Sequence, residues 1–218
     1  AASDVYKRQV FGNPAIWVLA IANFFVYIVR YAVLDWGPTL LGEWKGVSIH
    51  HAGWMVAAFE ISGIVGMLVA GWATDRFFGG RGPRVCVICM ALATVFVALF
   101  WGISQPPMWL ATLLLGAAGF CIYGPQALVG IAAANIATKK AAATAVGFTG
   151  LFGYASTLVS GWGLGLLAQH YGWNIAVGAL ILIAIMGTLI FMAAWSAKAN
   201  GYDLSLIHIS EPTRHLRI

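Results

Sequence analysis

Two charged residues stand in the middle of long apolar stretches, where each could bind a group of opposite charge. Arg30 lies within AIANFFVYIVRYAVLDW and Glu60 within AAFEISGIVG. An arginine at the centre of a membrane-spanning helix costs roughly 2.5–3.5 kcal/mol, so such a residue is by default a candidate for function. Its planar guanidinium matches phosphate and carboxylate groups with two parallel hydrogen bonds. We therefore expect Arg30 to bind an anionic substrate, with a structural ion pair to Asp35 or Glu60 as the alternative.

Three tyrosines accompany this pair of charges. Tyr27 precedes Arg30 by three residues and therefore lies on nearly the same helix face. Tyr123 precedes a Gly-Pro pair, and a proline inside a helix removes a hydrogen bond and produces a kink. Tyr154 lies in GFTGLFGY. Together with Arg30 they predict an aromatic-lined anion site, whereas each tyrosine alone is equally consistent with an interior aromatic. We expect Glu60 to balance the charge of Arg30 when no substrate is bound; proton coupling is the alternative.

A further charged group lies in the segment GWATDRFFGGRGPR, which contains Asp75, Arg76 and Arg81. An acid at a helix end can lie against the N-terminus of a neighbouring helix, where the helix dipole favours negative charge. Nearby arginines can pair with that acid and hold two helices together. We expect these three residues to form a gating loop; the alternative is the ordinary enrichment of basic residues in loops on one side of a membrane.

The elements that position these residues are predicted to be six membrane-spanning helices. The 218 residues are 61% hydrophobic and only 9% charged, against about 25% charged in soluble domains. This composition excludes a soluble globular domain, a disordered protein and a disulfide-stapled secreted module. A spanning helix needs ~20 mostly apolar residues, and the short alternation typical of a transmembrane barrel is absent. We predict an all-α polytopic membrane protein with spans at 14–41, 51–74, 84–103, 108–137, 141–168 and 173–196.

The basic residues predict how these spans are oriented. Six of the eight lysines and arginines between residues 10 and 203 lie in the segments 76–84 and 139–140 or at Lys198, and these positions must share one side. Lys45 is on the other side and Arg30 is inside a span. Because cytoplasmic loops carry an excess of Lys and Arg, we expect both ends of this region to be cytoplasmic. Membrane topology then accounts for the basic character of the chain, whose net charge is +5 over all 218 residues, without a nucleic-acid partner. Residues 10–203 hold eight bases and five acids, a net charge of +3.

The two ends of the chain differ in composition from the middle. Residues 1–9, AASDVYKRQ, and residues 204–218, LSLIHISEPTRHLRI, resemble translations of a transposon-based sequencing adapter. Segments of that origin are excluded from fold reasoning. We therefore expect the protein proper to be residues 10–203, a fragment that is open at both sides.

Several of these segments resemble a known transporter family. The D-R segment, FFVYIVRYAVLDWGPTLL and IYGPQALVGIAAANIATKKAAATAVGFTGLFGY, with the spacing between them, are similar to the major facilitator superfamily and specifically to its organophosphate:phosphate antiporters. The similarity covers residues 12–200 and is greatest to the last six helices of the glycerol-3-phosphate transporters. The resemblance implies the C-terminal half of a twelve-helix transporter in the bacterial inner (cytoplasmic) membrane, which exchanges an organophosphate for inorganic phosphate by alternating access.

The resemblance also implies roles for individual residues. It implies that Arg30 binds the phosphate together with an arginine of the missing N-terminal six-helix half. It further implies that Tyr27, Tyr123 and Tyr154 line the site, that Glu60 is the buried acid near it, and that the bound partners are small phosphates and the lipid bilayer, with no cofactor and no metal.

The substrate within this family is left open by the residues. The resemblance implies that hexose-phosphate transporters carry a lysine in the span-five motif, whereas here Thr149 stands within GFTGLFGY, which argues against hexose phosphate. A phosphoglycerate transporter, a hexose-phosphate transporter and a transporter-like hexose-phosphate sensor remain the alternatives.

A membrane enzyme is the alternative from a different class of function. It would need paired titratable groups within the spans, such as a histidine with an acid, and we find none in the sequence. Cys86 and Cys89 read C-V-I-C but no second pair or histidine cluster accompanies them, so buried thiols are expected. We predict that the chain is not an enzyme.

Overall fold

The computed structural model describes residues 9–197. The ends that resemble a translated adapter, residues 1–9 and 204–218, lie outside this range except for Gln9. Their origin, and with it the boundaries of the predicted fragment, stays a prediction.

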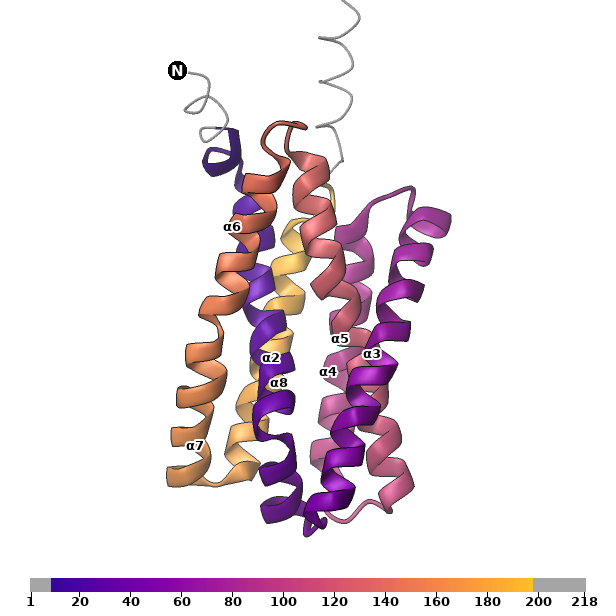
Figure 1. The fold of residues 1–218 in the computed structure, drawn as a ribbon, viewed down its shortest axis with the longest axis vertical. Coiled ribbons are helices and arrows are strands. Elements are labelled where there is room, and N and C mark those ends of the chain that lie inside the picture. Colours follow the sequence, from indigo (N-terminus) through magenta and orange to yellow (C-terminus); the bar gives the residue numbers. More distant parts are fainter. Residues whose placement is uncertain (1–8, 198–218) are drawn as a thin grey trace, which may run out of the picture.

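Six helices of the described region are long and apolar enough to cross a membrane, and they pack as one bundle (Figure 1). The predicted all-α architecture is thereby confirmed, and the predicted spans agree with the helices to within a few residues. Their bounds are α2 (Pro14–Lys45), α3 (Ile49–Phe78), α4 (Gly82–Gly102), α5 (Met108–Ile136), a fifth span made of α6 (Ala142–Ala155) and α7 (Leu164–Tyr171), and α8 (Trp173–Ala193).

Two helices extend beyond the predicted spans because hydropathy detects only the apolar part of a helix. α2 continues to Lys45 and ends at Gly46, whose positive φ of 68° favours glycine. α3 continues through Phe78, so Asp75 and Arg76 lie in its last turns. The interpretation of those two residues as part of a loop was therefore wrong, and only Arg81 lies between the two helices.

The fifth span is not one continuous α-helix as the apolar stretch 141–168 suggested. Between α6 and α7 the backbone forms a five-residue π-helix, η1 (Val159–Gly163), and Figure 1 shows α6 and α7 as one bent column. The indole Nε1 of Trp36 in α2 donates a hydrogen bond of 3.0 Å to the carbonyl of Ser160 within this segment. A side chain from a neighbouring helix thus satisfies a backbone group where the regular hydrogen-bond ladder changes.

The backbones of α3 and α5 lie in close contact, because a glycine of each helix faces a backbone carbonyl of the other. A methyl group on Gly66 would lie 1.9 Å from the carbonyl oxygen of Phe120. One on Gly119 would lie 2.3 Å from the carbonyl oxygen of Phe59. Small residues permit such close packing of helices in lipid, where dispersion contacts replace the hydrophobic effect. This contact holds Glu60 of α3 near Tyr123 of α5.

The helix connections alternate between the two ends of the bundle. The start of α2 and the connections α3–α4 and α5–α6 lie at one end, and the connections α2–α3, α4–α5 and α7–α8 lie at the other (Figure 1). The segments 76–84 and 139–140 therefore share one end, and Lys45 lies at the opposite end, as the sequence indicated. Which end faces the cytoplasm stays a prediction.

Candidate anion-binding site

Arg30, Glu60 and Tyr123 form one cluster contributed by three helices. An Nη2 atom of Arg30 in α2 lies 3.6 Å from Oε2 of Glu60 in α3. The same carboxylate oxygen accepts a short hydrogen bond from the Tyr123 hydroxyl of α5. The guanidinium carbon of Arg30 lies 4.6 Å from the centre of the Tyr123 ring, a distance at which the π face attracts the cation. Arg30 therefore pairs with Glu60 and not with Asp35, which lies exposed one and a half turns further along α2.

This cluster retains binding capacity. The side chains of Arg30 and Glu60 are 16% and 31% exposed. Nε of Arg30 and Oε1 of Glu60 are buried and have no hydrogen-bond partner among the described residues. Arginine carries five N–H donors, and the one at Nε has no partner among the described residues. The arrangement is an arginine held in place by an aromatic face and one carboxylate, with donors left for an anion.

The other two predicted tyrosines meet beside this cluster. The rings of Tyr27 and Tyr154 are 6.1 Å apart, although Tyr154 is 64% exposed. Tyr31 was not among the predicted site residues, but its ring lies 5.6 Å from the ring of Tyr27. The same ring lies 5.5 Å from the guanidinium carbon of Arg30. All five predicted site residues of the bundle centre, Arg30, Tyr27, Tyr123, Tyr154 and Glu60, are thus joined by direct or successive contacts.

Two polar residues near the site were also missed, and the sequence did carry a signal for them. Asn23 and Gln126 are uncharged polar residues within apolar runs, four residues before Tyr27 and three after Tyr123. Nδ2 of Asn23 donates a hydrogen bond of 2.9 Å to the Thr149 carbonyl, while Oδ1 of Asn23 and Oε1 of Gln126 are buried without a partner among the residues described. A polar side chain inside a span is costly, which is the same argument that identified Arg30.

The three residues of the predicted gating loop lie apart from this cluster, at the end of the bundle where α3 ends and α4 begins. Asp75 and Arg76 are exposed on the last turns of α3, and Arg81 precedes the first turn of α4. Within residues 9–197 no ion pair or side-chain hydrogen bond joins them. Their gating role stays a prediction.

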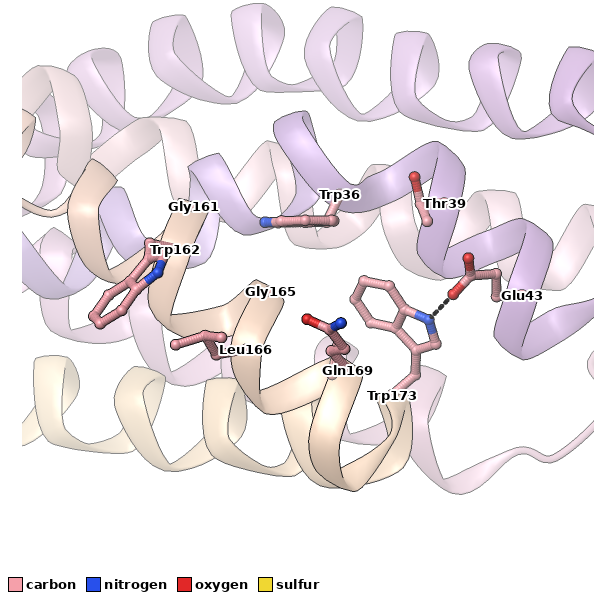
Figure 2. A pocket seen from close by; sticks show the side chains of 10 residues that line it. Trp36, Thr39, Glu43, Gly161, Trp162, Gly165, Leu166, Gln169 and Trp173 are labelled. Carbon is pink, nitrogen blue, oxygen red and sulfur yellow. Dashed lines mark hydrogen bonds between the residues drawn. The ribbon is translucent and has the colours of Figure 1, made fainter.

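A second polar region is a pocket of about 530 Å³ at the opposite end of the bundle (Figure 2). In Figure 2 the rings of Trp36 and Trp173 face the pocket, and the Trp173 indole donates a hydrogen bond of 2.7 Å to Glu43. Its polar wall residues include Glu43 and Gln169, and none of its lining residues is basic. A pocket with a carboxylate and no cation does not suit a phosphate, so the Arg30 cluster is the better anion site.

The fold and the site together define a class of protein. A bundle of six apolar helices is the arrangement of a polytopic membrane protein, and a charged pair at its centre marks a candidate functional site. The chain belongs to the Major Facilitator Superfamily, whose family model matches residues 19–202.

Individual relatives specify the family further. The chain is 40% identical over 195 residues to a protein of Chlamydia pneumoniae named probable hexose phosphate transport protein. It is 36% identical over 194 residues to the glycerol-3-phosphate transporter of Bacillus subtilis and 34% identical over 204 residues to the hexose-6-phosphate:phosphate antiporter of Escherichia coli. Membrane sensor proteins named UhpC also match, at 33–34% identity. These relatives confirm the predicted resemblance to organophosphate:phosphate antiporters, and they are named as transporters or sensors and not as enzymes, as expected.

These alignments cover 88–89% of this chain but only 43–44% of the three transporters. The chain therefore spans less than half the length of the relatives it matches, which agrees with one half of a larger transporter. The sequence identities to glycerol-3-phosphate transporters, 35% and 36%, are not higher than the 40% identity to the probable hexose phosphate transport protein. Sequence identity therefore does not favour glycerol-3-phosphate as the substrate.

Proposed function

We propose that this chain is the C-terminal six-helix half of a transporter that exchanges an organophosphate for inorganic phosphate. The observation that carries the proposal is Arg30, a cation near the middle of α2 that contacts Glu60 and Tyr123 yet keeps unused donors. The names of the relatives, several of which are phosphate-ester transporters, support the same class of substrate. The transported anion would bind Arg30 through two parallel hydrogen bonds.

Glu60 gives this site a way to remain neutral when it is empty. Its carboxylate lies 3.6 Å from Arg30, so an incoming phosphate competes with it for the guanidinium. Bound phosphate would draw together Arg30 and an arginine of the missing N-terminal half and so favour closure of the two halves around it. Glu60 balances only one of the two arginines, so an empty closed state would keep an uncompensated positive charge, which makes return without a bound anion unfavourable. Obligatory exchange follows from this electrostatic argument.

Two organophosphates are the leading substrates. The resemblance implies a lysine in the span-five motif of hexose-phosphate transporters, and Thr149 in the corresponding motif of this chain therefore favours glycerol-3-phosphate. The 40% identity to a probable hexose phosphate transport protein favours a hexose phosphate as the second candidate. We propose glycerol-3-phosphate first and leave phosphoglycerate as a further member of the same substrate class.

The topology and the predicted gate belong to the same proposal. The excess of basic residues at the end formed by the segments 76–84 and 139–140 supports a cytoplasmic location for that end. Both ends of the fragment would then be cytoplasmic in a bacterial inner membrane. Asp75, Arg76 and Arg81 lie at this end, where they would contact the missing half and secure the cytoplasmic gate.

Uptake into loaded and empty vesicles tests the proposed exchange. We expect the full-length parent protein, reconstituted into vesicles, to take up labelled phosphate only when the vesicles contain phosphate or an organophosphate. Uptake into empty vesicles at the same rate would contradict obligatory exchange. Saturable binding of organophosphate without any exchange would instead identify a sensor.

Replacing Glu60 by glutamine tests whether the acid only balances charge. We expect Glu60→Gln to retain phosphate exchange with an unchanged pH profile, because glutamine keeps the shape and Arg30 is exposed enough to be solvated by water. The KM for phosphate should be no higher than in the wild type, since a competing anion has been removed. The measurement is the initial rate of exchange between about pH 5.5 and about 8.5, because the pH dependence of a rate reports the groups whose protonation matters to it. A displaced pH profile would indicate proton coupling.

A further inference from the structure

The described residues contain few buried side-chain polar atoms without a hydrogen-bond partner, and those few gather at one place. They are Nε of Arg30, Oε1 of Glu60, Oδ1 of Asn23 and Oε1 of Gln126. Roughly 90% or more of buried polar groups in proteins have a hydrogen-bond partner, so a cluster of unpartnered atoms needs an explanation. Arg30 and Glu60 already belong to the anion site. Asn23 and Gln126 lie on the same two helices as Tyr27 and Tyr123.

Contacts place both amides around Tyr27. Asn23 precedes Tyr27 by four residues and therefore shares its face of α2. A methyl group on Gly153 would lie 2.9 Å from Nδ2 of Asn23 and 3.3 Å from the Tyr27 ring, so both side chains border the same glycine of α6. The side chain of Gln126 also interacts with the Tyr27 hydroxyl. The two amides are thus linked to the anion site through one tyrosine.

The unpaired atoms of Asn23 and Gln126 are both amide oxygens, which accept hydrogen bonds, and this determines what the two residues can bind. Nδ2 of Asn23 is engaged with the Thr149 carbonyl, so its oxygen is the end left free. An amide oxygen has no proton to donate and carries partial negative charge, so it repels the oxygens of a phosphate. It accepts hydrogen bonds from hydroxyl groups. A phosphate ester of a polyol or sugar offers both, with its phosphate suited to Arg30 and its hydroxyls suited to the amides.

We propose that Gln126, together with Asn23, forms a subsite for the hydroxyl groups of the organic part of the substrate. The proposal rests on the organophosphate exchange proposed above and assigns the part of the site that distinguishes an organophosphate from inorganic phosphate. Leucine at position 126 would fill the space without an unsatisfied oxygen, so packing alone does not account for the amide of Gln126. Gln126 is the better position to test, because Asn23 is only 3% exposed and its amide also joins α2 to α6.

Competition against phosphate exchange tests the subsite in the full-length parent protein. The variant Gln126→Met keeps the length of the side chain and removes the amide. Labelled phosphate is exchanged into phosphate-loaded vesicles in the presence of glycerol-3-phosphate, glucose-6-phosphate or n-propyl phosphate, the last of which has no hydroxyl on its carbon chain. We expect the half-inhibiting concentration of the more effective hydroxylated ester to rise about three- to tenfold, the effect of one lost neutral hydrogen bond. The KM for phosphate and inhibition by n-propyl phosphate should change less than about twofold.

The control variant is Gln169→Met, the same change at an exposed glutamine of the Trp36 pocket, and it should alter none of these values. Equal weakening of all three competitors and of phosphate by Gln126→Met would make Gln126 a structural residue and overturn the subsite. Unchanged inhibition by both hydroxylated esters would also overturn it. Absence of phosphate exchange by the wild type would refute the proposed antiporter itself, which separates that failure from failure of the subsite.

Discussion

Arg30→Lys should lower the rate of phosphate exchange by the full-length parent protein about 10- to 100-fold. Lysine keeps the positive charge but replaces a planar fork of five donors by one ammonium group. A hydrogen bond to a charged group contributes about 1.5–3 kcal/mol, and loss of one such bond from the bound phosphate corresponds to that range of rates. The stacking of the guanidinium on Tyr123 at 4.6 Å is lost as well. The measurement is the initial rate of labelled phosphate uptake into phosphate-loaded vesicles.

A matched control is available at the end of the bundle. Arg84 lies in the first turn of α4, and its Nε donates a hydrogen bond of 3.4 Å to the Trp195 carbonyl, away from the site. Arg84→Lys should leave the exchange rate within about twofold of wild type, as surface substitutions usually do. Equal loss of exchange in Arg84→Lys and Arg30→Lys would mean that arginine is needed for assembly and not for binding phosphate.

Gly66→Ala should destabilise the bundle strongly. The added methyl group would lie 1.9 Å from the Phe120 carbonyl oxygen, and backbone atoms cannot move aside as a flexible side chain can. α3 and α5 would have to separate, which would also draw Glu60 away from Tyr123. Overpacking costs about 1–3 kcal/mol and occasionally more, so we expect the midpoint of thermal unfolding to fall by roughly 5 °C or more. The measurement is thermal unfolding of the purified full-length protein in detergent, monitored as the fraction of protein that remains monodisperse after heating.

Gly71→Ala is the control for this effect. Gly71 lies on the same helix, and nothing comes within 4 Å of a methyl group at that position. Alanine is also the better helix former, so the midpoint should stay the same or rise slightly. If Gly66→Ala were as stable as Gly71→Ala, the close approach of α3 and α5 would not be required by the fold.

The sequence predicts the presence of the spans and of the costly charges better than it predicts their neighbours. Arg30 and Glu60 are identifiable because a charge in an apolar run is expensive wherever the helix packs. Helical periodicity places Tyr27 on the face of Arg30, but it does not tell which residue of another helix meets that face. The choice of Glu60 over Asp35 as the ion-pair partner depends on the packing of α2 against α3 and therefore required the structure.

Two features could not be predicted from local patterns. The π-helix Val159–Gly163 interrupts a long stretch without charged residues, and its carbonyl at Ser160 is satisfied by Trp36, which is 124 residues away in sequence. Tyr31 follows Arg30 directly and so does not share its face by spacing, yet the long guanidinium side chain still reaches the Tyr31 ring. The contact at the π-helix is distant in sequence, and the contact at Tyr31 depends on the length of the arginine side chain, so neither follows from local spacing.

Binding of labelled inorganic phosphate to the purified full-length protein tests most directly the claim that Arg30 holds the transported anion. Wild type and Arg30→Lys are compared by equilibrium binding, after thermal unfolding has established that both are folded. The account predicts saturable phosphate binding by the wild type, displaced by organophosphate, and binding at least about tenfold weaker in Arg30→Lys. Equal phosphate affinity in the two folded proteins would contradict it.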